Sequence, residues 1–273
     1  MVDGPPRSGP GAPYPVIRIA HLYPSLLNVA GDGGNVIAIE RRAGWRGMAT
    51  EITPVELGES VDLTTFDLIF VQGGQDIEMA VAAGDLQGKA VTLRDAADLG
   101  VAIFAVCAGL QLLGHRYIPR SGAAIEGIGL LDLETRAGDA RFMQHAACQV
   151  GFGDRPQTVV GFENHSGLTE LGPGLRPFGT VIAGAGNNGR DGTEGARRDN
   201  VYATYLHGPV LPKNPWLTDH LIRIVLERKL GGTIELAELD DALEQNAHDL
   251  ALDVALGNRG RRTALEPARL GRA

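Results

Sequence analysis

The sequence predicts an α/β fold in which helices cover both faces of a parallel sheet. Two runs, 66–74 and 101–106, are continuously apolar instead of alternating, as expected for strands buried on both faces. The stretch between them, 79–100, has helical character, and strand, helix, strand is the repeating unit of a parallel sheet. Glycine is abundant at 38 residues and aromatic residues make up only 5%, which suits many tight strand-to-helix turns.

The elements follow one another in an order that fits this class. A β-branched run at 16–23 predicts the first strand, 35–47 a helix with Gly44 near its end, and 48–57 a second strand. Beyond Gly114 the segments 127–138, 142–152, 157–167, 178–189 and 201–210 predict a β-rich excursion that returns to the sheet. An amphipathic helix over 214–232 begins at Asn-Pro and ends at Gly-Gly.

The chain divides by composition into three parts. Residues 1–15, rich in proline and glycine, are predicted to be a disordered leader with no signal peptide. Residues 16–231 are predicted to form the α/β domain. Residues 232–273 are predicted to be a helical extension, with a helix over 235–256, followed by a basic tail.

Composition excludes several classes of function. A net charge of -8 argues against a nucleic-acid binder, which needs clustered Lys and Arg. Two cysteines cannot form a disulfide framework and make a poor metal site, so we expect a reducing compartment and no metal. The longest uncharged run, 99–114, falls short of the roughly 20 residues that span a bilayer. We therefore expect a cytoplasmic protein without a transmembrane segment.

Cys107 stands where the strand 101–106 ends and a helix begins. Ligands of open parallel sheets bind outside the carboxyl ends of the strands. The small residues Ala105, Ala108 and Gly109 beside Cys107 are typical of a nucleophile elbow, in which a strained turn presents the side chain to a cleft. The structural alternative is a buried cysteine of an apolar strand, which is common.

Two other strand ends add to the nucleophile hypothesis. Gly73 and Gly74 close the preceding strand, so the Gly74 amide could form an oxyanion hole with that of Ala108. His207 ends a further strand and precedes Gly-Pro, a place for the general base of a thiol. The structural alternatives are a simple turn at the glycine pair and a core histidine at His207.

Several motifs together resemble a known family. VCAGLQLLG (106–114), VQGGQD (71–76) and YLHGP (205–209) resemble a class I, triad-type glutamine amidotransferase domain, in its cobyric acid synthase-like branch. GDGGNVIAIERRAGWRG, GFENHSGLTELG, GAGNNGRDGTEG and YATYLHGPVLPKNP are similar to the glutaminase subunits of lipid II isoglutaminyl synthases. The resemblance runs from about Ile17 to about Leu230 and implies a flavodoxin-like sheet.

The resemblance implies a reaction and a partner. Cys107 attacks the side-chain amide of glutamine, His207 acts as acid and base, and a thioester is hydrolysed to glutamate. The ammonia passes to a MurT-like Mur-ligase subunit, in a heterodimer that meets lipid II at the inner face of the membrane. No GxxxxGK[ST] phosphate loop occurs in this chain, so no cofactor is expected here, and ATP and Mg are expected in the partner.

For the substrate, the resemblance points to Arg141, which matches the arginine that this family uses for glutamine. A guanidinium recognises an α-carboxylate with two parallel hydrogen bonds, and Arg116, Arg120 and Arg136 are rivals. Gln111, one turn into the elbow helix, is a second candidate for substrate binding.

The residues beside the base depart from the class. Triad-type enzymes usually carry a carboxylate two residues after the histidine, and this chain has Pro209 there. A third member would come from elsewhere in the chain, from the partner, or not exist, and we favour the partner. Asp32 and Asn35 are expected to shape the cleft, although a helix cap at Asn35 explains that motif as well.

The remaining candidates have structural interpretations. His165 precedes Ser-Gly and is predicted to be a hydrogen-bonding residue of a turn, and Cys148 a buried apolar residue. Two alternatives to the lipid II glutaminase stay open, namely a cobyrinate-type amidotransferase glutaminase and a non-catalytic docking or regulatory partner.

Overall fold

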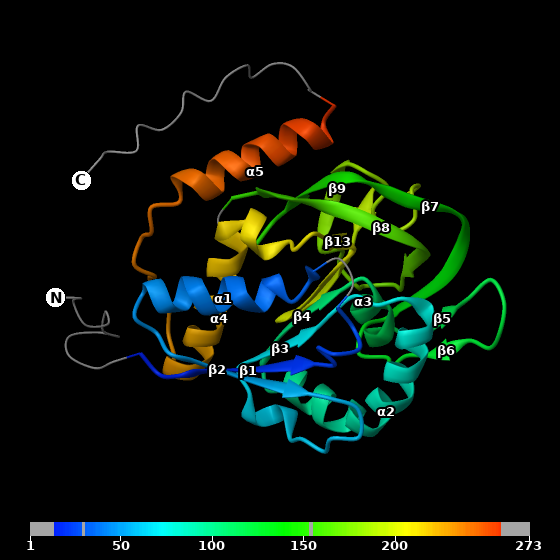
Figure 1. Cartoon of the computed structure of the whole chain (residues 1–273), viewed down its shortest axis with the longest axis horizontal. Coiled ribbons are helices and arrows are strands. Elements are labelled where there is room, and N and C mark those ends of the chain that lie inside the picture. Colours follow the sequence, from blue (N-terminus) through cyan, green and yellow to red (C-terminus); the bar gives the residue numbers. More distant parts are fainter. Residues whose placement is uncertain (1–13, 29–30, 153–154, 258–273) are drawn as a thin grey trace.

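A six-stranded sheet forms the centre of the structure, a computed structural model that describes residues 14–28, 31–152 and 155–257 (Figure 1). The strand order is β11-β12-β4-β3-β1-β2, and all neighbours are parallel except β11 and β12. Without β11 this is the order 2-1-3-4-5 of flavodoxin-like folds, which confirms the predicted class. The strands are β1 (Ile17–Leu22), β2 (Thr50–Val55), β3 (Leu68–Val71), β4 (Ala102–Val106), β11 (Ala196–Arg198) and β12 (Val201–Thr204).

Helices cover both faces of this sheet. Every residue of β3, β4 and β12 is buried, because these central strands have helices on either side, and this explains their continuous apolar runs. On one face α1 packs against α4, and on the other α2 packs against α3 (Figure 1). The helices are α1 (Gly34–Trp45), α2 (Asp76–Asp98), α3 (Ala108–Leu113) and α4 (Pro215–Leu230).

The region after α3 forms a second sheet of its own. Its order is β10-β9-β7-β5-β6, with β8 paired to both β7 and β13. The strands are β5 (Arg116–Ile118), β6 (Ile125–Glu126), β7 (Leu133–Val150), β8 (Gln157–Leu171), β9 (Gly179–Ala183), β10 (Thr193–Glu194) and β13 (Leu206–His207). Two separately predicted strands, 127–138 and 142–152, are joined in β7, whose register to β8 shifts between Ala137 and Phe142. The excursion is therefore a long hairpin beside the central sheet, which β12 rejoins.

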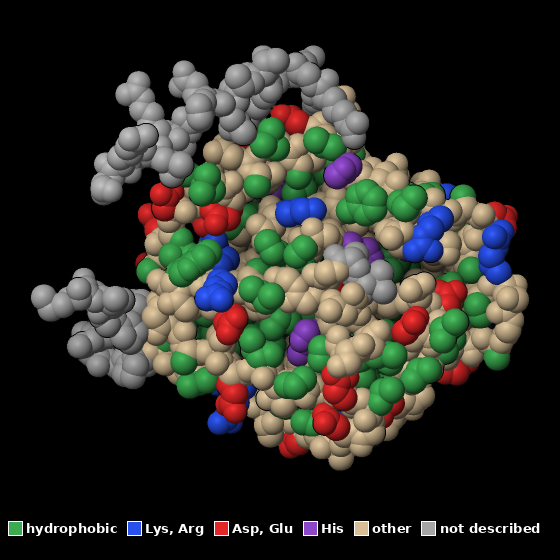
Figure 2. Space-filling model, in the orientation of Figure 1, with side chains coloured by type: hydrophobic (Ala, Val, Ile, Leu, Met, Phe, Trp, Pro, Cys, Tyr) green, Lys and Arg blue, Asp and Glu red, His purple; other side chains and the backbone are tan. Residues whose placement is uncertain are grey.

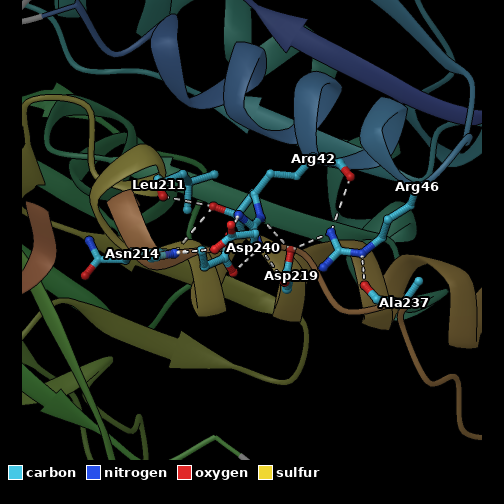
Figure 3. A network of polar contacts seen from close by, with 10 residues as sticks. Arg42, Arg46, Leu211, Asn214, Asp219, Ala237 and Asp240 are labelled. Carbon is cyan, nitrogen blue, oxygen red and sulfur yellow. Dashed lines mark hydrogen bonds and ion pairs between the residues drawn. The ribbon is translucent and has the colours of Figure 1, made fainter. Parts of the chain in front are cut away.

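Arg42 of α1 and Arg46, which follows the end of α1, hold the segment after α4 (Figure 3). Asp219 of α4 accepts hydrogen bonds from Arg42 Nε at 2.6 Å and from Arg46 Nη2 at 2.7 Å. Arg46 Nε also donates to the Ala237 carbonyl at 2.7 Å, and Arg42 Nη1 contacts Asp241 at 2.6 Å. Because both guanidinium groups are almost fully buried, these contacts fix 237–241 against α1.

The predicted helix at 235–256 is shorter than expected. It forms α5 (Ala242–Ala255), which lies across β7 and β8 (Figure 1). Its buried His248 contacts Thr158 Oγ1 at 2.8 Å and the Lys213 carbonyl at 3.0 Å. The helix thus packs on its own chain. The leader, apart from residues 14–15, and the tail after residue 257 lie outside the described residues, so the threefold division of the chain stays a prediction.

Two further features bear on the expected function. Over the face that Figure 2 shows, Asp and Glu side chains are interspersed with Lys and Arg, without a continuous basic stretch among the described side chains. Within residues 14–257, apart from the gaps at 29–30 and 153–154, no helix is both long and apolar enough to cross a membrane.

Candidate active site

Cys107 occupies a strained turn between β4 and α3. Its φ of 51° lies in the left-handed region that a residue with a Cβ avoids. The turn is tight because a Cβ on Gly109 would lie 2.5 Å from the Val71 carbonyl oxygen, so only glycine lets α3 approach the end of β3. The side chain is 8% exposed. The backbone geometry is that of a nucleophile elbow.

His207 comes from the segment that follows β12, the strand beside β4 in the central sheet. It follows β12 as the last residue of β13, which pairs with Phe162 and Glu163 of β8. The Nδ1 atom of its imidazole lies 2.9 Å from Asp32 Oδ2, and Cys107 is near enough for its charge to act on the ring. A Cβ on Gly73 would lie 2.7 Å from His207 Cε1, so the first glycine of the pair makes room for the ring.

The charges at this site favour a protonated imidazole. Burial alone would lower the pKa of His207, but the negative charge of Cys107 and the hydrogen bond to Asp32 raise it to about 10. Asp32 is fully buried and can accept a hydrogen bond from Nδ1–H, so Nε2 is the ring nitrogen left to exchange a proton. Cys107, His207 and Asp32 therefore form a chain of groups in which a thiolate can be paired with an imidazolium.

The origin of the third group corrects the sequence analysis. We favoured a carboxylate from a partner, yet Asp32 of the same chain lies on His207 Nδ1. Pro209 packs instead against α1, because a Cβ on Gly34 would lie 2.6 Å from its Cγ. Asn35 does not cap the helix. Its side-chain oxygen accepts the Leu211 N–H at 2.8 Å and ties the loop after His207 to α1.

The predicted oxyanion donors lie just beyond the ends of β3 and β4, which are neighbours in the central sheet. Ala108 is the first residue of α3, so its N–H has no acceptor within the helix. The Gly73 N–H points to Asp32 Oδ2 at 3.3 Å, which leaves Gly74 as the candidate donor of the glycine pair. Gly74 and Cys107 line the same cleft.

This cleft has a volume of about 360 Å³, within the size range of small-molecule sites. Arg141 of β7 lines it and is held by neutral Asn164, whose Oδ1 accepts from Nε at 2.7 Å. No carboxylate of the described residues forms an ion pair with Arg141, so its charge can bind a carboxylate of the substrate. Among the rivals, Arg116 and Arg136 contact Glu134, and Arg120 contacts Asp139. The cleft also includes two acidic residues at the start of α2, Asp76 and Glu78.

The sequence analysis was right about the position of Gln111 and wrong about that of His165. Gln111 lines the cleft as expected, and its Nε2 donates to the Tyr205 hydroxyl at 3.1 Å. The prediction of a turn at His165 was wrong, because this residue lies inside β8, 3% exposed, and lines the cleft. Asn, Ser and Gly around it indicate a turn by composition, but the pairing with β7 outweighs that preference.

A buried carboxylate supports the segment between β12 and the base. Glu194 Oε1 accepts hydrogen bonds from Thr204 Oγ1 at 2.5 Å and from the Tyr205 N–H at 2.8 Å. Burial raises the pKa of Glu194 to about 7, despite these hydrogen bonds. The sequence analysis missed this residue, because nothing in its neighbours predicts that a glutamate is buried.

Cys148 was predicted to be a buried apolar residue, and the structure agrees. Cys148 is buried, which raises the pKa of its thiol well above the usual range, as for an inert apolar residue. In the described part of the chain, no group of three or more His, Cys, Asp or Glu side chains could hold a metal ion.

Comparisons with known proteins agree with this geometry. Residues 18–215 match the model of the CobB/CobQ-like glutamine amidotransferase domain. The chain is 35% identical to the lipid II isoglutaminyl synthase (glutamine-hydrolyzing) subunit GatD of Streptococcus pneumoniae, over 88% of this chain and 93% of that one. It is 36% identical to the GatD subunit of Staphylococcus aureus, over 88% of this chain and 96% of that one.

More distant similarities exist. A probable cobyric acid synthase of Methanothermobacter thermautotrophicus is 32% identical over 68% of this chain, but only 38% of that protein is covered. A glutamine amidotransferase of Thermotoga maritima, known from its crystal structure, superimposes with a TM-score of 0.49 at 12% identity, over 87% of this chain and 96% of the other.

Proposed function

This chain belongs to the CobB/CobQ-like glutamine amidotransferase family, and from that premise we propose that it is the glutaminase subunit of a lipid II isoglutaminyl synthase. The observation that carries the proposal is the line of Cys107, His207 and Asp32 at the edge of a cleft that also contains Arg141. Relatives with the GatD name match almost the whole chain and supply the identity of the complex.

The first half of the proposed reaction breaks the amide. Arg141 holds the α-carboxylate of glutamine, and the Cys107 thiolate attacks the carbon of the side-chain amide. The negative charge on the oxygen is stabilised by the N–H groups of Gly74 and Ala108. The imidazolium of His207 gives its proton to the nitrogen, the C–N bond breaks, and ammonia leaves a γ-glutamyl thioester on Cys107.

The second half restores the enzyme. Neutral His207 takes a proton from a water molecule as its oxygen adds to the thioester, and the C–S bond breaks to release glutamate. Throughout the cycle Asp32 keeps the Nδ1 proton in place and stabilises the imidazolium. Cys107 then returns to its thiolate form.

The rest of the proposal concerns the partner. A MurT-like Mur-ligase subunit, which would hold ATP and Mg, activates the α-carboxylate of D-glutamate in lipid II and receives the ammonia to form D-isoglutamine. The GatD relatives are named as subunits, which supports the existence of such a partner. In the cell, we propose that the partner and its lipid substrate bring this chain to the inner face of the membrane.

The experiment is a reconstitution with a co-purified Mur-ligase-like protein. We expect glutamine-dependent amidation of lipid II by the pair, and ammonia release that is lost in Cys107→Ala. Free ammonium at high concentration should restore amidation to the Cys107→Ala complex, because only the ammonia source is removed. Glutamine-dependent amidation by the Cys107→Ala complex would instead identify the chain as a docking subunit.

A further inference from the structure

His165 carries a buried nitrogen whose hydrogen-bonding capacity is unused. Its Nδ1 lies 2.9 Å from the Gly167 carbonyl oxygen, and since a carbonyl can only accept, Nδ1 bears the hydrogen. Nε2 of the neutral ring is then a bare acceptor. This atom is buried and has no partner among the described residues, although His165 is one of the residues that line the cleft. A buried acceptor without a donor is costly unless a ligand supplies one.

The ring is held in place and kept neutral. It stacks on Tyr205 with 3.7 Å between ring centroids and 13° between the planes. Phe142 packs edge to face against it, with 5.5 Å between the ring centroids. Burial, helped by the positive charges of His207 and Arg141, lowers the pKa of His165 to about 4. Near neutral pH the side chain is therefore a fixed acceptor and not a second acid.

The position of His165 relates it to the reacting end of the substrate. The Tyr205 hydroxyl beneath the ring contacts Gln111, one helical turn after Cys107. Arg141, in contrast, is exposed at the outer part of the cleft. A glutamine whose α-carboxylate lies on Arg141 would extend its side-chain amide inward, to the part of the cleft that Cys107 and His165 line.

We propose that Nε2 of His165 accepts a hydrogen bond from the side-chain amide N–H of glutamine and thereby selects glutamine over glutamate. This inference rests on the proposed function. The γ-carboxylate of glutamate has no hydrogen to donate, so its oxygens would face the lone pair of Nε2. The same contact that retains the substrate amide therefore weakens the binding of the product and favours its release.

The α-ammonium group of glutamine has better partners in the cleft. Asp76 and Glu78, at the start of α2, are carboxylates that line it, and one oxygen of Glu78 is buried without a partner among the described residues. A cation is stabilised more by a carboxylate than by a neutral imidazole. Because the α-ammonium group binds the carboxylates, His165 is left to accept the hydrogen bond from the side-chain amide.

The test measures ligand binding by calorimetry with the full chain carrying Cys107→Ala, which cannot turn over. Adding His165→Leu should weaken L-glutamine binding by about tenfold to a hundredfold and leave L-glutamate unchanged or tighter. His145→Leu is the matched control, since His145 is exposed on β7 and does not line the cleft. It should change neither affinity. Equal weakening of both ligands, or of neither, would overturn the proposal.

A second measurement needs no variant of His165. On the same Cys107→Ala chain, L-glutamic acid γ-methyl ester, which is neutral and lacks the amide hydrogens, should bind at least about tenfold more weakly than glutamine. Equal binding of the ester and glutamine would refute the role of His165. If glutamine itself does not bind, the proposed function fails. If glutamine and the ester bind equally well, only the role of His165 fails.

Discussion

Replacing Asp32 by asparagine tests whether this chain completes its own catalytic triad. Asp32 is fully buried and lies 2.9 Å from His207 Nδ1, and it contributes to raising the pKa of His207 from 6.5 to about 10. An asparagine keeps the volume but removes the charge, and its NH₂ group can turn the imidazole into the wrong tautomer. We expect glutamine turnover to fall by about a thousandfold to ten thousandfold, ~4 to 5.5 kcal/mol of transition-state stabilisation.

The assay is glutamate release by the full chain, alone and with the partner. Asp67→Asn is the matched control, because Asp67 is a buried carboxylate at the opposite end of the sheet, where it accepts from Arg18 N–H at 2.8 Å and from Lys229 at 2.7 Å. That variant should lose stability and keep its turnover. Turnover of Asp32→Asn within about threefold of the unmodified chain would refute the reasoning and return the third group to the partner.

Three further predictions concern the cleft, a buried charge and the backbone. In steady-state kinetics, Arg141→Ala should raise KM for glutamine by about tenfold to a hundredfold with little change in kcat. The control Arg116→Ala should change neither constant. If the two variants change KM equally, Arg141 is excluded from the site. Glu194→Gln removes a carboxyl whose pKa rises from 4.5 to about 7 on folding. Because the folded form holds the proton more tightly, this carboxyl favours folding at low pH, and that contribution is lost as pH rises through 7. Urea titrations at several pH values measure the free energy of unfolding of the unmodified chain and of Glu194→Gln. The value for the unmodified chain, relative to the variant, should fall by about 2 to 3 kcal/mol between pH 5 and pH 8. A difference that stays constant over this range would contradict the raised pKa of the buried carboxyl. Gly88→Ala in α2, where an added Cβ has nothing within 4 Å, should raise the free energy of unfolding by about 0.5 to 1 kcal/mol. Gly109→Ala should lower the free energy of unfolding by about 1 to 3 kcal/mol and reduce turnover, because the added Cβ would meet the Val71 carbonyl. If Gly88→Ala and Gly109→Ala behave alike in thermal melts, the tight turn at Cys107 is contradicted.

The central sheet could be predicted because its signals are local. Continuous apolar runs gave β3 and β4, and the glycine pair and Cys107 at their ends followed from the rule that ligands bind at the carboxyl edge. His207 and Arg141 entered through motifs. The structure adds that Cys107 lies near enough to His207 to act on its charge, and that Arg141 lines the same cleft as Cys107.

The parts that the sequence missed depend on contacts between distant residues. Asp32 and His207 are 175 positions apart, so no spacing rule links them. His165 looked like a turn residue because its neighbours are polar and small, but fourteen register pairs between β7 and β8 hold it in a strand. Pairing energy across a long hairpin is absent from any local window of sequence. The sequence analysis named both Asp32 and His165, but their roles in the site came only from the fold.

The most direct test of the account is to trap the acyl-enzyme. Full chain mixed with L-glutamine and quenched in acid within the first turnovers should carry a γ-glutamyl adduct on the peptide that contains Cys107, by mass spectrometry. The adduct should be absent from Cys107→Ala. It should also be strongly reduced in His207→Ala, because His207 protonates the nitrogen that leaves when the thioester forms. Ammonia release without an adduct at Cys107, or with an adduct at Cys148, would contradict the central claim that Cys107 is the nucleophile of a glutaminase.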